Sequence, residues 1–185
     1  MRNILLVISG PSGVGKGTVV EKLNGNGEFA LSVSCTTRPP RKGEKHGKSY
    51  FFLSREEFEQ KIKENDFLEY DNHFENFYGT PKSFVEEKLK SQSVILEIDV
   101  NGALNVKKSY PEAVLVILTP PDMETLKKRL RGRRTESEEE LELRLSRARW
   151  ELSQADKFDY RVVNGAFEET ISNIKNIISE EKNRV

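Results

Sequence analysis

The sequence has few of the residues that stabilise a secreted or a metal-bound fold. Its 185 residues include one cysteine, Cys35, and two scattered histidines. One thiol cannot form an internal disulfide, and this set does not make the ligand cluster that a structural metal needs. We therefore expect neither a disulfide framework nor a zinc site.

Long hydrophobic runs and an excess of one charge are also missing. Runs such as ILLVI (4–8) and VLVIL (114–118) are far shorter than the roughly 20 residues of a membrane-spanning helix, and the first ten residues lack a signal-peptide pattern. The 30 Lys and Arg balance the 30 Asp and Glu, so no overall field favours nucleic acid or an anionic membrane. We expect a cytoplasmic protein with small-molecule partners, either monomer or homodimer.

Short apolar runs alternate with longer amphipathic stretches along the chain. This alternation is typical of strands and crossover helices in a parallel sheet. We predict strands at residues 4–9, 93–99, 113–118 and 160–164. Each is almost continuously apolar, as expected for strands that helices cover on both faces. The sequence thus predicts an α/β fold of three layers with a central parallel sheet.

Capping residues mark several helix boundaries. Ser54 and Ser137 are each followed three positions later by glutamate, which predicts two capping boxes. Thr80 before Pro81 predicts an N-cap followed by proline at the first helical position. Apolar spacing predicts one helix from Ser137 to about residue 158 and another over residues 167–182.

Two polar, turn-rich stretches interrupt the alternation, at residues 34–80 and 131–136. Insertions between core elements often carry binding residues, because the rigid sheet positions them. The alternative is a solvated loop without a function.

The segment VISGPSGVGKGTVV (7–20) nearly matches the phosphate-binding pattern G-x-x-x-x-G-K-S/T. It follows a predicted strand and opens a predicted helix, so the N–H groups around Gly10, Gly13 and Gly15 can converge on phosphate oxygens. Lys16 can neutralise phosphate charge. The alternative is a glycine-rich turn that binds no ligand.

Gly17 stands where the pattern has Ser or Thr, whose hydroxyl holds Mg²⁺. Thr18 follows at once, and Mg²⁺ readily keeps several waters. We therefore predict that Mg·ATP is still used and that the metal is held mostly by ATP phosphates and by waters near Thr18. The competing interpretation is a decayed site that binds phosphate without transferring it.

Two acids, Glu97 and Asp99, stand at the carboxyl end of a predicted buried strand. Ligands of α/β sheets gather at this edge, and a carboxylate there can orient hydrated Mg²⁺. The alternative is that such acids only cap a helix.

Arginines gather in two parts of the chain. Arg38 and Arg41 lie in a proline-containing loop, and their planar guanidinium groups suit bidentate phosphate recognition. The second group consists of Arg131, Arg133, Arg134, Arg144 and Arg147. By themselves, the last two could simply pair with nearby acids on a solvated helix.

Over nearly the whole chain, GPSGVGK, SCTTRPPRKGE, GKSYFF, FLEY, YGTP, LEIDVNG, RLRGRRTESEEE and VVN, in this order, resemble the guanylate kinase family. The resemblance implies a single domain of three parts. These are a P-loop core (1–33, 82–120 and 143–185), a small mixed β/α GMP-binding insertion (34–81) and a short lid (121–142). It also implies γ-phosphoryl transfer from Mg·ATP to GMP, and to dGMP.

The resemblance also implies the roles of individual residues. Those for GMP are Ser34, Arg38, Arg41, Tyr50, Glu69, Tyr78, Thr80, Glu97 and Asp99. Those for ATP are Gly10, Ser12, Gly13, Val14, Gly15, Lys16, Gly17, Thr18, Arg133 and Asn164, the last at the adenine. The catalytic charges are Lys16, Arg38, Arg131 and Arg144, and the residue nearest the metal is Thr18.

Guanine and phosphate chemistry agree with these roles. Guanine has donors at N1 and N2 and an acceptor at O6, so Glu69 can accept from both donors while the hydroxyls of Ser34 and Thr80 donate to O6. The second pKa of the acceptor phosphate is about 6, so no general base is needed. Two alternatives remain, a scaffold domain of the same fold, against which the intact Gly15-Lys16 argues, and an adenylate-type kinase, against which Glu69 argues.

Overall fold

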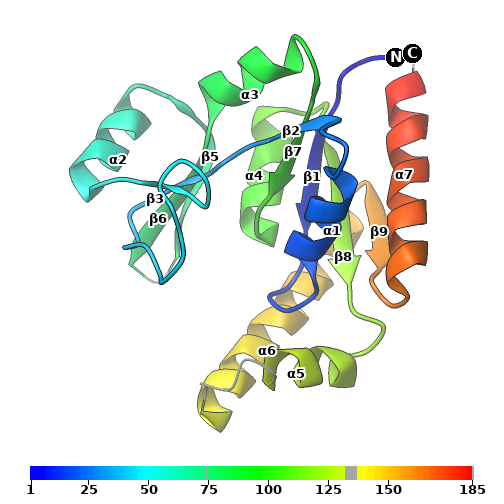
Figure 1. The fold of residues 1–185 in the computed structure, drawn as a ribbon. Coiled ribbons are helices and arrows are strands. Elements are labelled where there is room, and N and C mark those ends of the chain that lie inside the picture. Colours follow the sequence, from blue (N-terminus) through cyan, green and yellow to red (C-terminus); the bar gives the residue numbers. More distant parts are fainter. Residues whose placement is uncertain (74, 132–136, 185) are drawn as a thin grey trace.

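A five-stranded parallel sheet forms the centre of the computed structural model (Figure 1). Residues 1–73, 75–131 and 137–184 are described. The strands are β1 (Leu5–Ser9), β2 (Phe29–Leu31), β7 (Ser93–Glu97), β8 (Val114–Thr119) and β9 (Tyr160–Val163), in the order β2-β7-β1-β8-β9. All neighbouring pairs run parallel. The predicted α/β fold with a central parallel sheet is confirmed.

Helices cover the two faces of this sheet. Figure 1 shows α1 (Lys16–Leu23) and α7 (Phe167–Asn183) on one side, and α3 (Lys82–Leu89) and α4 (Val100–Ser109) on the other. The two chain ends lie side by side at the amino-terminal edge of the sheet. The opposite, carboxyl edge is the one at which ligands of parallel α/β sheets bind.

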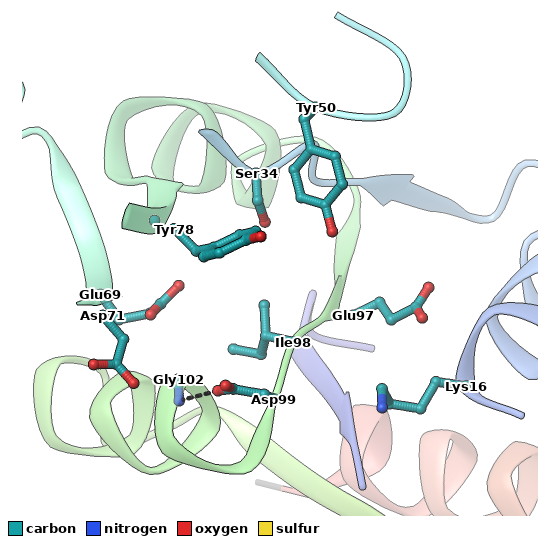
Figure 2. A pocket seen from close by; sticks show the side chains of 11 residues that line it. Lys16, Ser34, Tyr50, Glu69, Asp71, Tyr78, Glu97, Ile98, Asp99 and Gly102 are labelled. Atoms are coloured by element: carbon teal, nitrogen blue, oxygen red, sulfur yellow. Dashed lines mark hydrogen bonds between the residues drawn. The ribbon is translucent and has the colours of Figure 1, made fainter. Parts of the chain in front are cut away.

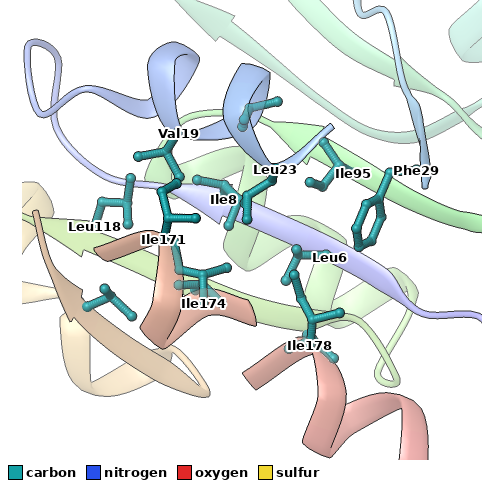
Figure 3. Packing of buried hydrophobic residues seen from close by; sticks show 14 of the residues in the cluster. Leu6, Ile8, Val19, Leu23, Phe29, Ile95, Leu118, Ile171, Ile174 and Ile178 are labelled. Carbon is teal, nitrogen blue, oxygen red and sulfur yellow. The ribbon is translucent and has the colours of Figure 1, made fainter. Parts of the chain in front are cut away.

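The side chains of β1 alternate between two hydrophobic cores. Leu6 and Ile8 pack with Val19 of α1 and Ile174 of α7 (Figure 3), while Leu5 and Val7 face α3 and α4. These side chains are almost fully buried, and each such burial contributes about 1.5–3 kcal/mol. A strand covered on both faces explains why its sequence is apolar without alternation.

A second, mixed sheet lies beside the first and is built from the chain between β2 and α3. Its strands are β3 (Cys35–Thr36), β4 (Phe51–Phe52), β5 (Phe67–His73) and β6 (Asn76–Pro81), in the order β4-β3-β6-β5. The helix α2 (Arg55–Lys63) packs on it through Phe58, whose ring stacks on Phe67 and Phe77. This small unit has its own core and falls within the predicted insertion.

A helical hairpin stands at the carboxyl edge of the parallel sheet (Figure 1). It consists of α5 (Met123–Arg131) and α6 (Glu138–Ser153). Its core cluster contains Leu126, Leu130, Leu141, Leu145 and Ala148. The apolar spacing of both helices therefore serves their mutual packing.

The four predicted strands and both capping boxes are confirmed. At Ser54 and Ser137 the serine side chain accepts from the glutamate N–H while the glutamate side chain accepts from the serine N–H. Within the described ranges, no helix is long and apolar enough to cross a membrane.

Two predictions at the element ends are wrong, and one strand was missed. Thr80 belongs to β6 and Pro81 is the N-cap of α3, because the Thr80 hydroxyl bonds to Glu69 and not to the helix. The helix α6 ends at Ser153, and a 3-10 turn (Ala155–Lys157) follows, because Ala155 packs in the core of the sheet and not in that of the hairpin. The short edge strand β2 was not predicted.

Candidate active site

The glycine-rich loop follows β1 at the carboxyl edge of the sheet and ends in α1. Gly10 and Gly15 have φ values of 140° and 102°. A Cβ at Gly10 would lie 2.4 Å from the Leu118 carbonyl oxygen, and one at Gly15 would lie 2.7 Å from Asn164 Nδ2. Only glycine fits both positions, so backbone N–H groups can turn toward a bound anion.

Two residues from other elements hold the outer part of this loop. The buried Asn164 side chain donates to the Val14 carbonyl at 2.7 Å, and Arg129 of α5 donates to the same carbonyl at 3.2 Å. Arg129 also donates to the Asn164 carbonyl at 3.1 Å. The loop is thus fixed from two sides before any nucleotide binds, and contact of Asn164 with adenine stays a prediction.

The Lys16 side chain folds back over the loop. Its ammonium donates to the carbonyl oxygens of Gly10 at 2.6 Å and Pro11 at 3.3 Å. Ser12 accepts from Arg144 of α6 at 2.7 Å, so a second cation from the hairpin reaches the same loop. The loop is surrounded by positive charge where a phosphate chain would lie.

The residues around Gly17 are those that could serve Mg²⁺. A Cβ there would lie 3.7 Å from both carboxylate oxygens of Glu97, which is ordinary contact, and Thr18 is exposed in the first turn of α1. Burial raises the pKa of Glu97, and the charge of Lys16 opposes this rise. In the described part of the chain, no group of three His, Cys, Asp or Glu could hold a metal ion. A few oxygen atoms near a phosphate loop suit an ion that keeps most of its waters.

A cavity of about 240 Å³ lies between the two sheets (Figure 2). Figure 2 shows Glu69 and Asp71 on one side of it and Glu97 and Lys16 on the other. It is lined by Lys16, Ser34, Tyr50, Glu69, Asp71, Tyr78, Gly79, Glu97, Ile98, Asp99 and Gly102. Most side chains predicted for GMP, which come from distant parts of the sequence, therefore meet at one place.

Glu69 is the buried acid of this cavity. Glu69 is only 8 % exposed, and the Thr80 hydroxyl donates a hydrogen bond to its carboxylate at 2.7 Å. Burial raises the pKa of Glu69 to about 7, and the nearby carboxylates of Asp99 and Asp71 add to the rise. A ligand that donates hydrogen bonds to this carboxyl would favour its ionised form.

A larger cleft of about 980 Å³ adjoins this cavity. Both share Lys16, Tyr78 and Asp99 in their walls. The cleft also contains Arg38 and Arg41 from the small unit, and Arg144 and Arg147 from α6. Four guanidinium groups and one ammonium therefore face a single cleft, as phosphate chemistry requires.

Two of the predicted arginines, Arg38 and Arg131, have acidic partners. Arg38 donates to both carboxylate oxygens of Glu44, at 2.9 and 3.0 Å, and this bond raises the pKa of the Arg38 guanidinium. Arg131 is exposed at the end of α5 and bonds to Glu138. The predicted residue Arg133, with Arg134, lies outside the described residues.

Sequence reasoning missed the contacts that join the hairpin to the rest of the site. Arg129 was not predicted, since it is hidden in the basic run KKRLR. Arg147 was grouped with the other arginines, but its partner Asp99 lies 48 positions earlier. The carboxylate of Asp71, which accepts from Asn101 at 3.4 Å, was also not predicted. No local spacing in the sequence indicates such pairs.

Comparison with known proteins gives a consistent picture. The family model described as guanylate kinase matches residues 2–181. The chain is 54 % identical to guanylate kinase of Clostridium tetani over 185 residues, covering all of this chain and 89 % of the relative. For guanylate kinase of Clostridium acetobutylicum, the identity is 49 %, with 88 % of that relative covered.

Solved structures agree. The crystal structure of guanylate kinase from Anaplasma phagocytophilum superposes with a TM-score of 0.80 at 34 % identity, covering all of this chain and 88 % of that one. Shikimate kinase from Bacteroides thetaiotaomicron, at 13 % identity and a TM-score of 0.56 over 95 % of this chain and 98 % of that one, shares the fold alone. With a family model spanning nearly all residues and close relatives along the whole length, the chain belongs to the guanylate kinase family.

Proposed function

We propose that the protein transfers the γ-phosphoryl group of Mg·ATP to GMP, reversibly, giving ADP and GDP. Membership of the guanylate kinase family supports this activity. The observation that carries it is the pair of adjoining cavities, one with a buried carboxylate and one with converging cations, which share Lys16 in their walls. A base in the first and a triphosphate along the loop would bring two phosphate groups together there.

Guanine selection follows from the hydrogen bonds of the smaller cavity. Ionised Glu69 can accept hydrogen bonds from N1–H and from the N2 amine of guanine. Adenine has an acceptor at N1 and no amine at position 2, so it offers Glu69 neither donor. Because Thr80 already donates its proton to Glu69, Ser34 is left as the hydroxyl donor for O6, and the Thr80 oxygen can accept from N2. AMP would leave Glu69 without its donors, and a site built on such bonds rejects the wrong partner strongly.

The phosphates would be held by groups from three parts of the chain. We assign the GMP phosphate to Arg38, Arg41, Tyr50 and Tyr78. The Tyr50 and Tyr78 rings lie edge to face at 6.0 Å, and the Arg38 guanidinium lies 5.6 Å from the Tyr50 ring centre, so these groups form one wall. We assign the ATP phosphates to the glycine-rich loop and Lys16. Arg131 and Arg144 would balance the charge on the group in transfer.

No residue of the chain needs to remove a proton. The second pKa of a phosphate monoester is about 6, so the attacking oxygen is already ionised near neutral pH. The chain's part is to align two nucleotides, neutralise charge and exclude water. Mg²⁺ would neutralise charge on the ATP phosphate oxygens, with Thr18 and Glu97 orienting its waters.

A panel of acceptor nucleotides tests this function. With Mg·ATP as donor, we expect turnover of GMP and dGMP, because the assigned groups hold base and phosphate, and a kcat/KM for AMP lower by at least about 10²-fold. A coupled assay for ADP measures each rate. No turnover of GMP would contradict the proposal, and equal use of AMP would favour an adenylate-type kinase.

A further inference from the structure

Asp99 stands in the wall between the two cavities and is held by both of its carboxylate oxygens. As the N-cap of α4, its Oδ1 accepts from the Gly102 N–H at 2.8 Å. Its Oδ2 accepts from Arg147 Nη2 of α6 at 3.3 Å. The orientation of this carboxylate therefore depends on a residue of the hairpin.

Arg147 is shared between two acids. Its Nε donates to Glu151, one turn later on α6, at 3.4 Å. The side chain of Glu151 is only 6 % exposed, and burial raises the pKa of Glu151 while Arg147 opposes the rise. Glu151 fixes the near end of the guanidinium, so that its far end points across the cleft to Asp99. The pair Arg147–Glu151 is thus a support for the contact with Asp99.

The position of Asp99 matters because Glu69 is close to it. A Cβ at Gly102 would lie 3.3 Å from Asp99 Oδ1 and 3.2 Å from Glu69 Oε2, so the two carboxylates crowd the same turn of α4. Asp71 adds a third carboxylate to this cavity. Like charges in a half-buried cavity repel, and a guanidinium on one of them reduces the repulsion.

We propose that Arg147 is a positioning residue for the acceptor nucleotide, which acts by holding Asp99 in place beside Glu69 and so connects the α5–α6 hairpin to the guanine cavity. The inference rests on the proposed function. In this role Arg147 acts on the nucleotide through Asp99. It need not contact a phosphate directly, which its place in the cation-lined cleft would also allow, and it does more than pair with Glu151 on its own helix.

A double-mutant cycle with Asp99 separates these roles. Asparagine is also a good N-cap residue, so Asp99→Asn removes the negative charge and keeps the helix cap. We expect Arg147→Gln to raise the KM for GMP about tenfold, since coupled neighbours interact by amounts of this size, and to leave the KM for ATP within about twofold. In the Asp99→Asn background, Arg147→Gln should add less than about twofold. Arg147→Lys should restore part of the loss.

Two controls keep the test valid. Arg149→Gln makes the same change at an exposed site of the same helix and should leave all constants unchanged. Because Arg147→Gln leaves Glu151 buried beside a neutral group, the variant Arg147→Gln/Glu151→Gln removes that charge as well. We expect this pair to fold like the wild type and to show the same rise in the KM for GMP.

Several outcomes would overturn the inference. If Arg147→Gln lowers kcat at unchanged KM for GMP, Arg147 acts on the phosphates. If its effect is equally large in the Asp99→Asn background, it does not act through Asp99. If Arg147→Gln behaves like Arg149→Gln, it has only a structural role. A wild-type enzyme that does not use GMP would contradict the proposed function instead, which this assay shows separately.

Discussion

In the proposed function, single residues carry the base selection and the charge balance of this site. Glu69 is buried with Thr80 as its hydrogen-bond partner, and Lys16 lies where the two cavities meet. Each is a single group whose loss should affect one substrate or one step.

Glu69→Gln should weaken the use of GMP far more than the use of ATP. The amide would set its NH₂ against a guanine donor, at a cost of about 1–3 kcal/mol, which is roughly 10- to 10²-fold in the KM for GMP. Steady-state kinetics with each substrate varied in turn measures both constants. Equal losses for GMP and ATP would rule out the role in base selection.

The use of GMP should also depend on pH through Glu69. With its pKa raised to about 7, the free enzyme holds this carboxyl partly protonated near neutral pH, whereas guanine needs the ionised form. The KM for GMP should therefore fall as the pH rises through about 7, beyond the change due to the phosphate at about 6. Glu69→Gln should lose this step, and its survival in that variant would assign the step to another group.

Lys16→Met should lower kcat by about 10²- to 10³-fold, the usual effect of removing one charge aimed at the group in transfer. Methionine is unbranched and of similar length, so circular dichroism and thermal unfolding should match the wild type. Near-normal turnover in a folded variant would refute the assignment of the glycine-rich loop.

The elements show which parts of the fold the sequence predicts and which it does not. Buried strands and capping boxes are local patterns, so they could be predicted from the sequence alone. The end of α6 could not, because apolar spacing continues through Ala155 although that residue packs in a different core. In the same way, the glycine-rich loop is a local pattern, whereas the contact of Arg147 with Asp99 exists only after α6 has packed against the sheet.

At the start of α1, Gly17→Ser should change the Mg²⁺ requirement only slightly. The position has ordinary backbone geometry, and a Cβ would lie at contact distance from Glu97, so the variant should fold. If waters near Thr18 and Glu97 already serve the metal, an added hydroxyl should alter activity by no more than a few-fold. Titration of activity with Mg²⁺ measures this. An inert wild type beside an active Gly17→Ser variant would show that the native site is decayed.

At the scale of the whole molecule, the site is assembled from three units: the parallel sheet, the small mixed sheet and the α5–α6 hairpin. Arg38 and Arg41 come from one unit, Arg144 from another and Lys16 from the third. Cations on separate units repel until anions lie between them, so both nucleotides should draw the units together. The resemblance of the sequence to its family indicated these units, but not the contacts that connect them.

In the proposed function, two nucleotides lie end to end in the adjoining cavities. Small-angle scattering with an inhibitor that joins adenosine and guanosine through a phosphate chain tests this claim most directly. We predict that one such molecule per chain makes the protein more compact than either GMP or ATP alone does. A scattering profile unchanged from that of the free protein, at saturating inhibitor, would contradict this arrangement of the two nucleotides.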